Sequence, residues 1–237
     1  YDLIFHCAGY GQPAKFLKFK SSVYKLNSNV IINLKDNLKK QGKFIYLSTT
    51  EIYSGNEKKC NEESTGYTDA THPRSSYIDS KRFGESYVVN CMNNFLIFRA
   101  CLIYGPGTKM NDERVLNQVI LRGIKNKKID VYGGLNQLRS NLFISDAINM
   151  IIKSTVKYKR QIFNINNHKM TTIGEMVKTI SKISHKKFIN HKSFLKGSPK
   201  IIKISNKRIL NGINYRISTS LKEGLLKTFN WYSNLIN

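Results

Sequence analysis

KFIYLSTTEIYSG, residues 43–55, is an apolar run that ends abruptly in a cluster of Ser, Thr and Glu. A short apolar run of this kind, preceded here by Gly42, is typical of a strand buried in a sheet. Ligands of an open parallel sheet bind beyond the carboxyl ends of its strands. The polar residues 48–51 are therefore where we expect chemistry.

Two further apolar runs flank this one, and amphipathic segments separate the three. LIFHCAG (3–9) and FLIFRACLIYG (95–105) read as the other two strands, the second closed by Gly-Pro-Gly. Residues 22–40 and 76–92 carry apolar residues at helical spacing. The order is βαβαβ, and right-handed crossovers place all three strands in one parallel sheet covered by helices.

The character of the sequence changes after Pro106, where a polar stretch leads into shorter elements. We expect helices and strands in alternation, namely a helix near 114–125, a strand at 129–133, an apolar helix beginning near Asp146 and a strand at 161–166. Thr172 with Glu175, and Ser220 with Glu223, have the spacing of a capping box at a helix start. The sequence after Pro106 therefore predicts a smaller lobe that packs closely on the lobe formed by the first half of the chain.

Composition narrows the class of protein. The chain has 237 residues, 41% of them hydrophobic, which suits a globular protein with one good core. No apolar run approaches the roughly 18–20 residues needed to cross a bilayer, so we expect a soluble protein. The four cysteines are far apart and form no CxxC pair, which argues against a zinc site or a disulfide framework and favours the cytoplasm.

The net charge of +24 raises the alternative of nucleic-acid binding. The lysines, however, are scattered along the whole chain among abundant Asn and Ile. This distribution disfavours a nucleic-acid partner. It favours a basic cleft that attracts a small anionic substrate such as a nucleotide diphosphate.

Tyr77 and Lys81 lie four residues apart on the helix predicted over 76–92, so both side chains project from one face. A tyrosine, with its ordinary pKa near ~10, becomes a useful acid/base when a neighbouring ammonium favours its phenolate form. A Ser or Thr hydroxyl can share the proton. The pair therefore predicts a catalytic centre together with the Ser/Thr cluster.

These residues carry a resemblance to a known family, the extended short-chain dehydrogenase/reductases of the NAD-dependent epimerase/dehydratase type. Four stretches, two of which contain the residues discussed above, occur in the order of that family: LSTTEIYSG (47–55), YIDSK (77–81), FRACLIYGPG (98–107) and VYGGLNQLRSNLFISDA (131–147). With SLKEGLLKTFNWY at the end, the resemblance extends essentially from Asp2 to Trp231.

The resemblance implies an α/β fold with a Rossmann-type parallel sheet that lacks its first strands. Residues 1–106 would be a partial NAD(P)-binding domain with the catalytic residues. Residues 107–237 would be mainly a substrate-binding lobe, with part of 140–166 returning to the first domain. The Gly-rich fingerprint that should precede the strand at 3–9 is not in this chain, so we expect a fragment that binds the dinucleotide poorly by itself.

The resemblance also implies NAD, with NADP not excluded, and transient oxidation of a nucleotide-diphosphate sugar at C4. Tyr77 would be the catalytic base, Lys81 would lower its pKa, Thr49 would orient the substrate hydroxyl and Glu51 would be the acid of the Thr-x-Glu segment. The residues expected to bind the cofactor are Ala8, Gly9, Ser48, Tyr77 and Lys81. Those expected to bind the substrate are Thr50, Tyr104, Arg114 and Arg139, the arginines by clamping the diphosphate.

The pattern is closest to UDP-glucuronate decarboxylase-like members, which predicts a lyase ahead of a 4-epimerase or a 4-keto reductase. Thr50 stands where the dehydratases have the aspartate that protonates the departing hydroxyl, so dehydration is disfavoured. Leu102 replaces an asparagine that contacts the diphosphate in the family. A degenerate, non-catalytic nucleotide-binding relative is the non-enzyme alternative. We also expect a homodimer, no membrane insertion, no metal, and Thr49, Tyr77 and the 104–107 turn in one cleft.

Overall fold

The structure is a computed structural model, and it describes residues 1–191 and 203–236. The chain divides into two compact units. Unit 1 comprises Tyr1–Cys101, Ile148–Asn166 and Ile202–Arg216. Unit 2 comprises Leu102–Ala147, Asn167–Ile201 and Ile217–Asn237. The assignment of a cofactor-binding and a substrate-binding domain to these parts stays a prediction.

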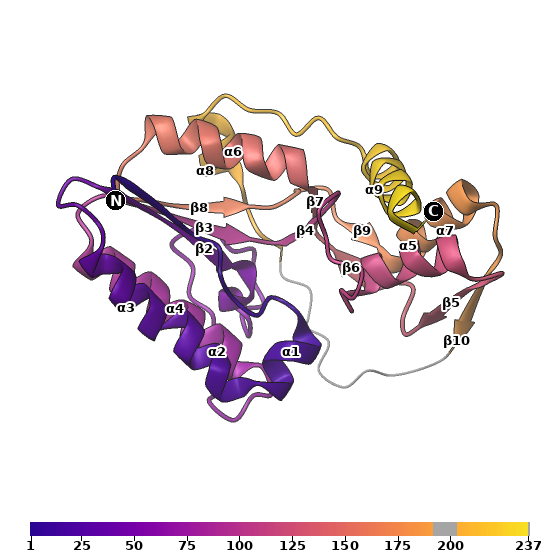
Figure 1. Cartoon of the computed structure of the whole chain (residues 1–237), viewed down its shortest axis with the longest axis horizontal. Coiled ribbons are helices and arrows are strands. Elements are labelled where there is room, and N and C mark those ends of the chain that lie inside the picture. Colours follow the sequence, from indigo (N-terminus) through magenta and orange to yellow (C-terminus); the bar gives the residue numbers. More distant parts are fainter. Residues whose placement is uncertain (192–202, 237) are drawn as a thin grey trace. The chain divides into compact units, whose positions relative to one another are not determined.

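Unit 1 is built on a four-stranded parallel sheet, shown in Figure 1. Its strands are β1 (Leu3–His6), β2 (Lys43–Thr49), β3 (Phe95–Ala100) and β8 (Gln161–Ile165), in the order β1-β2-β3-β8. The prediction of an α/β fold with a parallel sheet is confirmed. Because all four strands run the same way, their carboxyl ends meet at one edge, and the Ser/Thr/Glu cluster follows β2 there.

Four helices cover one face of this sheet: α1 (Pro13–Lys18), α2 (Lys20–Asn27), α3 (Asn29–Asp36) and α4 (Ser75–Cys91). The predicted single helix over 22–40 is wrong, since the chain breaks at Ser28 and the second helix ends at Asp36. The physical reason is Asn27, which is fully buried and donates its side-chain N–H to Ser80 Oγ of α4 at 3.0 Å. Asn27 thus anchors the end of α2, and the helix restarts after it.

Two helices lie on the opposite face of the sheet, α6 (Ile144–Lys157) and α8 (Lys207–Gly212) (Figure 1). Lys43 at the start of β2 donates its ammonium to the backbone oxygens of Thr155 and Tyr158, the latter at 3.0 Å. Apolar residues fill the layer between, including the stacked rings of Phe98 and Phe163, whose centroids are 6.1 Å apart. The sheet of unit 1 is therefore covered on both faces, as parallel sheets require.

The third predicted strand, over 95–105, is wrong as one continuous element. β3 ends at Ala100, and a separate strand β4 (Leu102–Tyr104) pairs in parallel with β7 (Asn141–Phe143). The cause is the length of its neighbours, because β2 ends at Thr49 and β8 at Ile165, so the ladder has no partner beyond this point. The last bond goes from Cys101 N to Ile165 O at 3.1 Å.

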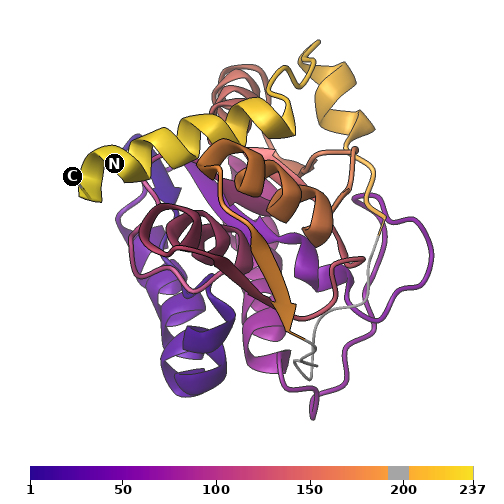
Figure 2. The ribbon, with the colours of Figure 1, turned by 90° about the vertical axis from the view of Figure 1, so that its right-hand side faces the viewer.

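Unit 2 packs three helices together, α5 (Val115–Lys125), α7 (Ile173–Ser184) and α9 (Leu221–Ile236), visible in Figure 2. Its other strand pairs are parallel β5 (Ile129–Tyr132) with β10 (Phe188–His191) and antiparallel β6 (Leu138–Arg139) with β9 (Thr171–Thr172). The capping box of Thr172 and Glu175 is present at the start of α7. Apolar side chains of the three helices form the core of this unit.

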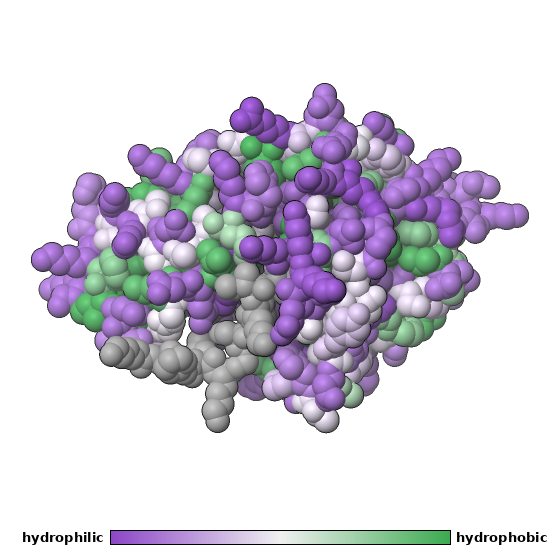
Figure 3. Space-filling model, turned by 180° about the vertical axis from the view of Figure 1, so that it is seen from behind, coloured by the Kyte–Doolittle hydropathy of each residue, from purple (hydrophilic) through white to green (hydrophobic). Residues whose placement is uncertain are grey.

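Hydrophilic residues make up most of the face shown in Figure 3, and hydrophobic residues form smaller areas between them. Within residues 1–191 and 203–236, no helix is long and apolar enough to cross a membrane.

Candidate active site

The end of β2 presents the Thr-x-Glu segment on a rigid turn. Thr49, the last residue of the strand, is buried, and its Oγ1 accepts a hydrogen bond from Glu51 N at 3.2 Å. This bond caps the short helix η1 (Thr50–Tyr53), which begins directly after the strand. Thr50 donates its hydroxyl to Ala100 O at the end of β3, at 3.3 Å. The backbone of the segment is thus fixed at both strand ends.

α4 carries Tyr77 and Lys81 against this strand end. The helix packs on both β2 and η1, and both side chains are buried. Lys81 Nζ donates to Leu47 O at 2.9 Å and lies 4.9 Å from the centroid of the Tyr46 ring. A Cβ at Gly84 would lie 2.3 Å from the Tyr46 hydroxyl, so only glycine lets the helix approach the strand this closely. The predicted Tyr-x-x-x-Lys face therefore points at the sheet.

Burial tunes the charge of the lysine. Removal from water lowers the pKa of Lys81 to about 8. Burial, with a smaller effect of the Lys81 charge, likewise lowers the pKa of His6 to about 4. Among the described residues, neither ring nitrogen of His6 has a hydrogen-bond partner. Near neutral pH, Lys81 is therefore a charged ammonium and His6 is a neutral imidazole.

Glu51 is held in place by an arginine at the start of α4. Arg74, which precedes α4, donates its Nε to Glu51 Oε2 at 2.8 Å and its second guanidinium nitrogen to Oε1. Its guanidinium carbon also lies 4.7 Å from the ring centroid of Phe16. Phe16 in turn stacks on Tyr77. No pattern in the sequence singles out Phe16, because its contact with Tyr77 spans 61 positions and arises only when α1 packs on α4.

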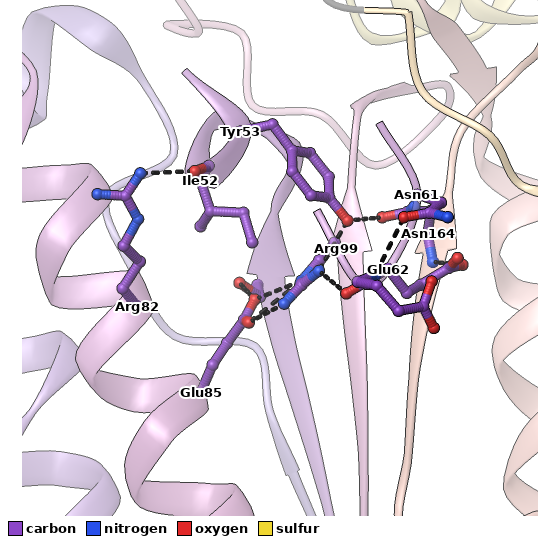
Figure 4. A network of polar contacts seen from close by, with 10 residues as sticks. Ile52, Tyr53, Asn61, Glu62, Arg82, Glu85, Arg99 and Asn164 are labelled. Atoms are coloured by element: carbon purple, nitrogen blue, oxygen red, sulfur yellow. Dashed lines mark hydrogen bonds and ion pairs between the residues drawn. The ribbon is translucent and has the colours of Figure 1, made fainter. Parts of the chain in front are cut away.

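Ser48 contacts a buried polar network, of which Figure 4 shows Tyr53, Glu85, Arg99 and Asn164. Its hydroxyl donates to Glu85 Oε1 at 2.5 Å, and Glu85 receives the guanidinium of Arg99, with a shortest distance of 2.7 Å. Arg99 donates further to the Tyr53 hydroxyl at 2.7 Å, which donates to Asn164 Oδ1 at 2.8 Å. The network ties β2, α4, β3 and β8 together behind the candidate site. The cofactor contact expected of Ser48 stays a prediction.

The backbone after β1 approaches Lys81 closely, which bears on whether a cofactor fits. A Cβ built on Gly9 would lie 3.4 Å from Lys81 Nζ and 3.3 Å from Asn27 Oδ1. Asn27 Oδ1 is buried, with no hydrogen-bond partner in the described part of the chain. The backbone at Gly9 thus lies beside both the Lys81 ammonium and the unpartnered Asn27 Oδ1. This surface suits the ribose hydroxyls of a dinucleotide.

The remaining predicted residues belong to unit 2. Tyr104 is buried in its core against Phe143, with ring centroids 5.6 Å apart, and burial raises the pKa of its phenol. Arg114 forms an ion pair with Asp112 at 2.7 Å. Arg139 donates to Leu138 O and Gln137 Oε1, both at 2.8 Å. Their substrate contacts stay predictions, as does the single cleft of Thr49, Tyr77 and the 104–107 turn.

A cavity of about 290 Å³ lies beside α4. It is lined by Arg82, Glu85, Val89 and Asn90 of that helix and by the 64–66 loop, and by none of the residues predicted to be catalytic. It is therefore not the candidate active site. In the described part of the chain, no group of three or more His, Cys, Asp or Glu could hold a metal ion.

Known proteins resemble this chain in sequence. The sequence profile of the NAD dependent epimerase/dehydratase family matches residues 1–166. A UDP-glucuronic acid decarboxylase 1 from Xenopus tropicalis is 24% identical over 240 residues, which cover 98% of this chain and 56% of that protein. The chain thus spans little more than half the length of this relative.

Solved structures share the fold at low identity. A UDP-glucose 4-epimerase with UDP-glucose from Thermotoga maritima has a TM-score of 0.88 and 20% identity, covering 100% of this chain and 78% of that one. The protein MoeE5 in complex with UDP-glucose and NAD has a TM-score of 0.85 and 16% identity, covering 100% and 80%. At these identities the likeness concerns the fold alone.

Proposed function

This chain belongs to the NAD dependent epimerase/dehydratase family, and we propose that it modifies a nucleotide sugar through transient oxidation at C4, with UDP-glucuronate decarboxylation as the reaction. The observation that carries the proposal is Glu51, fixed at the end of β2 by Thr49 and Arg74 on the turn that α4 packs against. A 4-epimerase needs no carboxyl group there. A decarboxylase needs an acid.

NAD is the cofactor in this proposal, held by Ala8, Gly9, Ser48, Tyr77 and Lys81. When bound, it takes a hydride from the sugar and later returns one. Gly9 supports this choice, because its missing side chain leaves backbone exposed beside Lys81 Nζ. Lys81 keeps its other N–H groups for ribose hydroxyls after donating to Leu47 O.

Tyr77 acts as the base that removes the proton from the C4 hydroxyl. A neighbouring ammonium favours the phenolate that this step requires, Lys81 is the proposed source of that charge, and both residues are buried, where charges interact more strongly than in water. Thr49 orients the substrate hydroxyl and shares its proton. Its Oγ1 already accepts one bond from Glu51 N and keeps its own O–H to donate.

The 4-keto sugar is a β-keto acid when C5 carries a carboxylate, so the C5–C6 bond breaks and carbon dioxide leaves. The electron pair stays on the enolate, and an acid must then protonate C5. Glu51 is the proposed donor: its carboxylate, paired with Arg74, takes up a proton from solvent water and passes it to C5, and Arg74 stabilises the carboxylate that remains after the transfer. Thr50, Tyr104, Arg114 and Arg139 are proposed to bind the substrate, the two arginines at its diphosphate. A cytoplasmic homodimer completes the proposal.

The test is to incubate the purified protein and NAD with UDP-glucuronate and, separately, with UDP-glucose. We expect carbon dioxide and a pentose nucleotide from the first and no 4-epimer from the second. A 4-epimer of UDP-glucose without carbon dioxide from UDP-glucuronate would assign the chain as an epimerase. Bound NAD that is never reduced by either sugar would assign it as a non-catalytic nucleotide-binding relative.

A variant separates the role of Glu51 from the reaction class. Glu51→Gln keeps the shape of the side chain and removes its proton-transfer ability, so we expect a decarboxylation rate lower by about 10²–10⁴-fold. The matched control is Asp79→Asn, because Asp79 also pairs with an arginine, Arg82, but on the exposed side of α4. An unchanged rate in Glu51→Gln would remove the role of Glu51 and leave the class intact.

A further inference from the structure

Four side chains from three separate parts of unit 1 form a continuous row. Glu51 of η1 is paired with Arg74, whose guanidinium carbon is 4.7 Å from the ring centroid of Phe16. Phe16 of α1 lies parallel to the ring of Tyr77, with centroids 4.5 Å apart and an angle of 5° between the planes. The row thus links the carboxyl group of the Thr-x-Glu segment to the tyrosine through contacts at every step.

The row is shielded from water except at its Glu51 end, where the side chain is 25% exposed. Phe16 is 0% exposed, and Arg74 and Tyr77 are each 7% exposed. In such surroundings a guanidinium over an aromatic face is worth more than at an exposed site. Arg74 also sits at the start of α4, where its backbone oxygen accepts from Tyr77 N and Ile78 N at 3.1 Å. The same residue therefore holds the backbone and, through Phe16, the ring of Tyr77.

Only an arginine can make these contacts together. Its guanidinium is planar, so its edge binds both oxygens of Glu51 while its face lies on Phe16. A lysine at the same place would keep the charge but lose the flat face and the second hydrogen bond. Likewise, an aliphatic side chain in place of Phe16 would contact Tyr77 without fixing the plane of its ring.

We propose that Arg74 and Phe16 are positioning residues, which hold the Tyr77 ring and the Glu51 carboxyl group in one fixed arrangement. The proposal rests on the proposed function for its effect on catalysis. Neither residue exchanges a proton with substrate. Their effect is on the direction in which the Tyr77 hydroxyl and the Glu51 carboxyl group point, and a misplacement of about 1 Å can cost on the order of 10²-fold in rate.

The first experiment follows the Tyr77 ring without any need for activity. Tyrosines are labelled with ¹³C in the ring, the Tyr77 signals are assigned with Tyr77→Phe, and the rate of ring flipping is measured by NMR. We expect slow flipping in the wild type and flipping faster by at least about 10-fold in Phe16→Leu, which removes the ring stacked on Tyr77, and in Arg74→Lys, which removes the guanidinium face that holds Phe16 in place. The control is Arg160→Lys, which removes a similar contact of an arginine with Phe95, 5.2 Å away, elsewhere in unit 1.

The second experiment measures kcat and KM for the same variants with UDP-glucuronate. We expect kcat lower by about 10- to 100-fold with KM changed by less than about 3-fold, and a double variant no worse than the poorer single variant, because both residues act through one row. Thermal melts followed by circular dichroism test whether each variant folds.

The outcomes separate this proposal from the proposed function. A wild-type flipping rate in both row variants, or losses in kcat that simply multiply in the double variant, would overturn the positioning role. A wild-type protein without activity on any nucleotide sugar would refute the proposed function, and the flipping rates would still decide whether the row holds Tyr77. Equal acceleration in Arg160→Lys would show a general loosening of unit 1 and would also overturn the proposal.

Discussion

Replacing Glu85 by alanine should destabilise unit 1 strongly, because it leaves a buried charge without its partner. The side chains of Glu85 and Arg99 are 8% and 9% exposed, and they meet through bonds of 2.7 to 3.1 Å. Within the described part of the chain, the Arg99 guanidinium in Glu85→Ala keeps the Tyr53 hydroxyl and Glu62 O as acceptors. Ser48 loses the acceptor of its hydroxyl as well.

Removal of one partner of a buried ion pair costs about 3–5 kcal/mol. For a protein of this size each kcal/mol lowers the melting temperature by roughly 2–4 °C, so we expect a decrease on the order of 10 °C. The measurement is the free energy of unfolding from urea denaturation, followed by circular dichroism, with a thermal melt beside it.

Asp79→Ala is the matched control, since Asp79 pairs with Arg82 on the same helix at 3.1 Å but is 36% exposed. Exposed pairs contribute about 0–1 kcal/mol, so this variant should melt close to the wild type. The double variant Glu85→Leu with Arg99→Leu should recover part of the loss, because no charge then remains buried. Equal stability losses in Glu85→Ala and Asp79→Ala would refute the reasoning.

Three further predictions concern single residues. Burial lowers the pKa of Lys81 to about 8 from 10.5, so between these pH values the folded state binds fewer protons than the unfolded state. The free energy of unfolding of the wild type, relative to that of Lys81→Met, should therefore rise with pH across that window when it is measured by urea denaturation. A difference that does not change with pH would contradict this prediction. Burial, and to a lesser extent the Lys81 charge, lowers the pKa of His6 to about 4 from 6.5, so stability should fall as the pH decreases from 6.5 toward 4, and His6→Phe should be less sensitive to acid over that range in thermal melts. Thr172→Ala removes the acceptor for Glu175 N at 3.0 Å and should cost about 1 kcal/mol in urea denaturation, whereas an unchanged midpoint would mean that the cap of α7 contributes nothing.

The sequence alone determined the class of fold and most of the candidate catalytic residues. Apolar runs separated by amphipathic stretches identify buried strands and covering helices, because a parallel sheet must be apolar on both faces. The spacing of Tyr77 and Lys81 fixes them on one helical face, since helix geometry is local. The capping box of Thr172 and Glu175 is equally local, and it formed as predicted.

Only the tertiary structure decided where elements end and what surrounds the candidate site. The break at Ser28 and the end of β3 at Ala100 follow from a buried bond of Asn27 to α4 and from the lengths of neighbouring strands. The stack of Phe16 on Tyr77 joins residues that no local pattern connects. Periodicity reports which face of an element is apolar, but contacts between distant segments depend on how those faces pack, and that information lies in the whole chain at once.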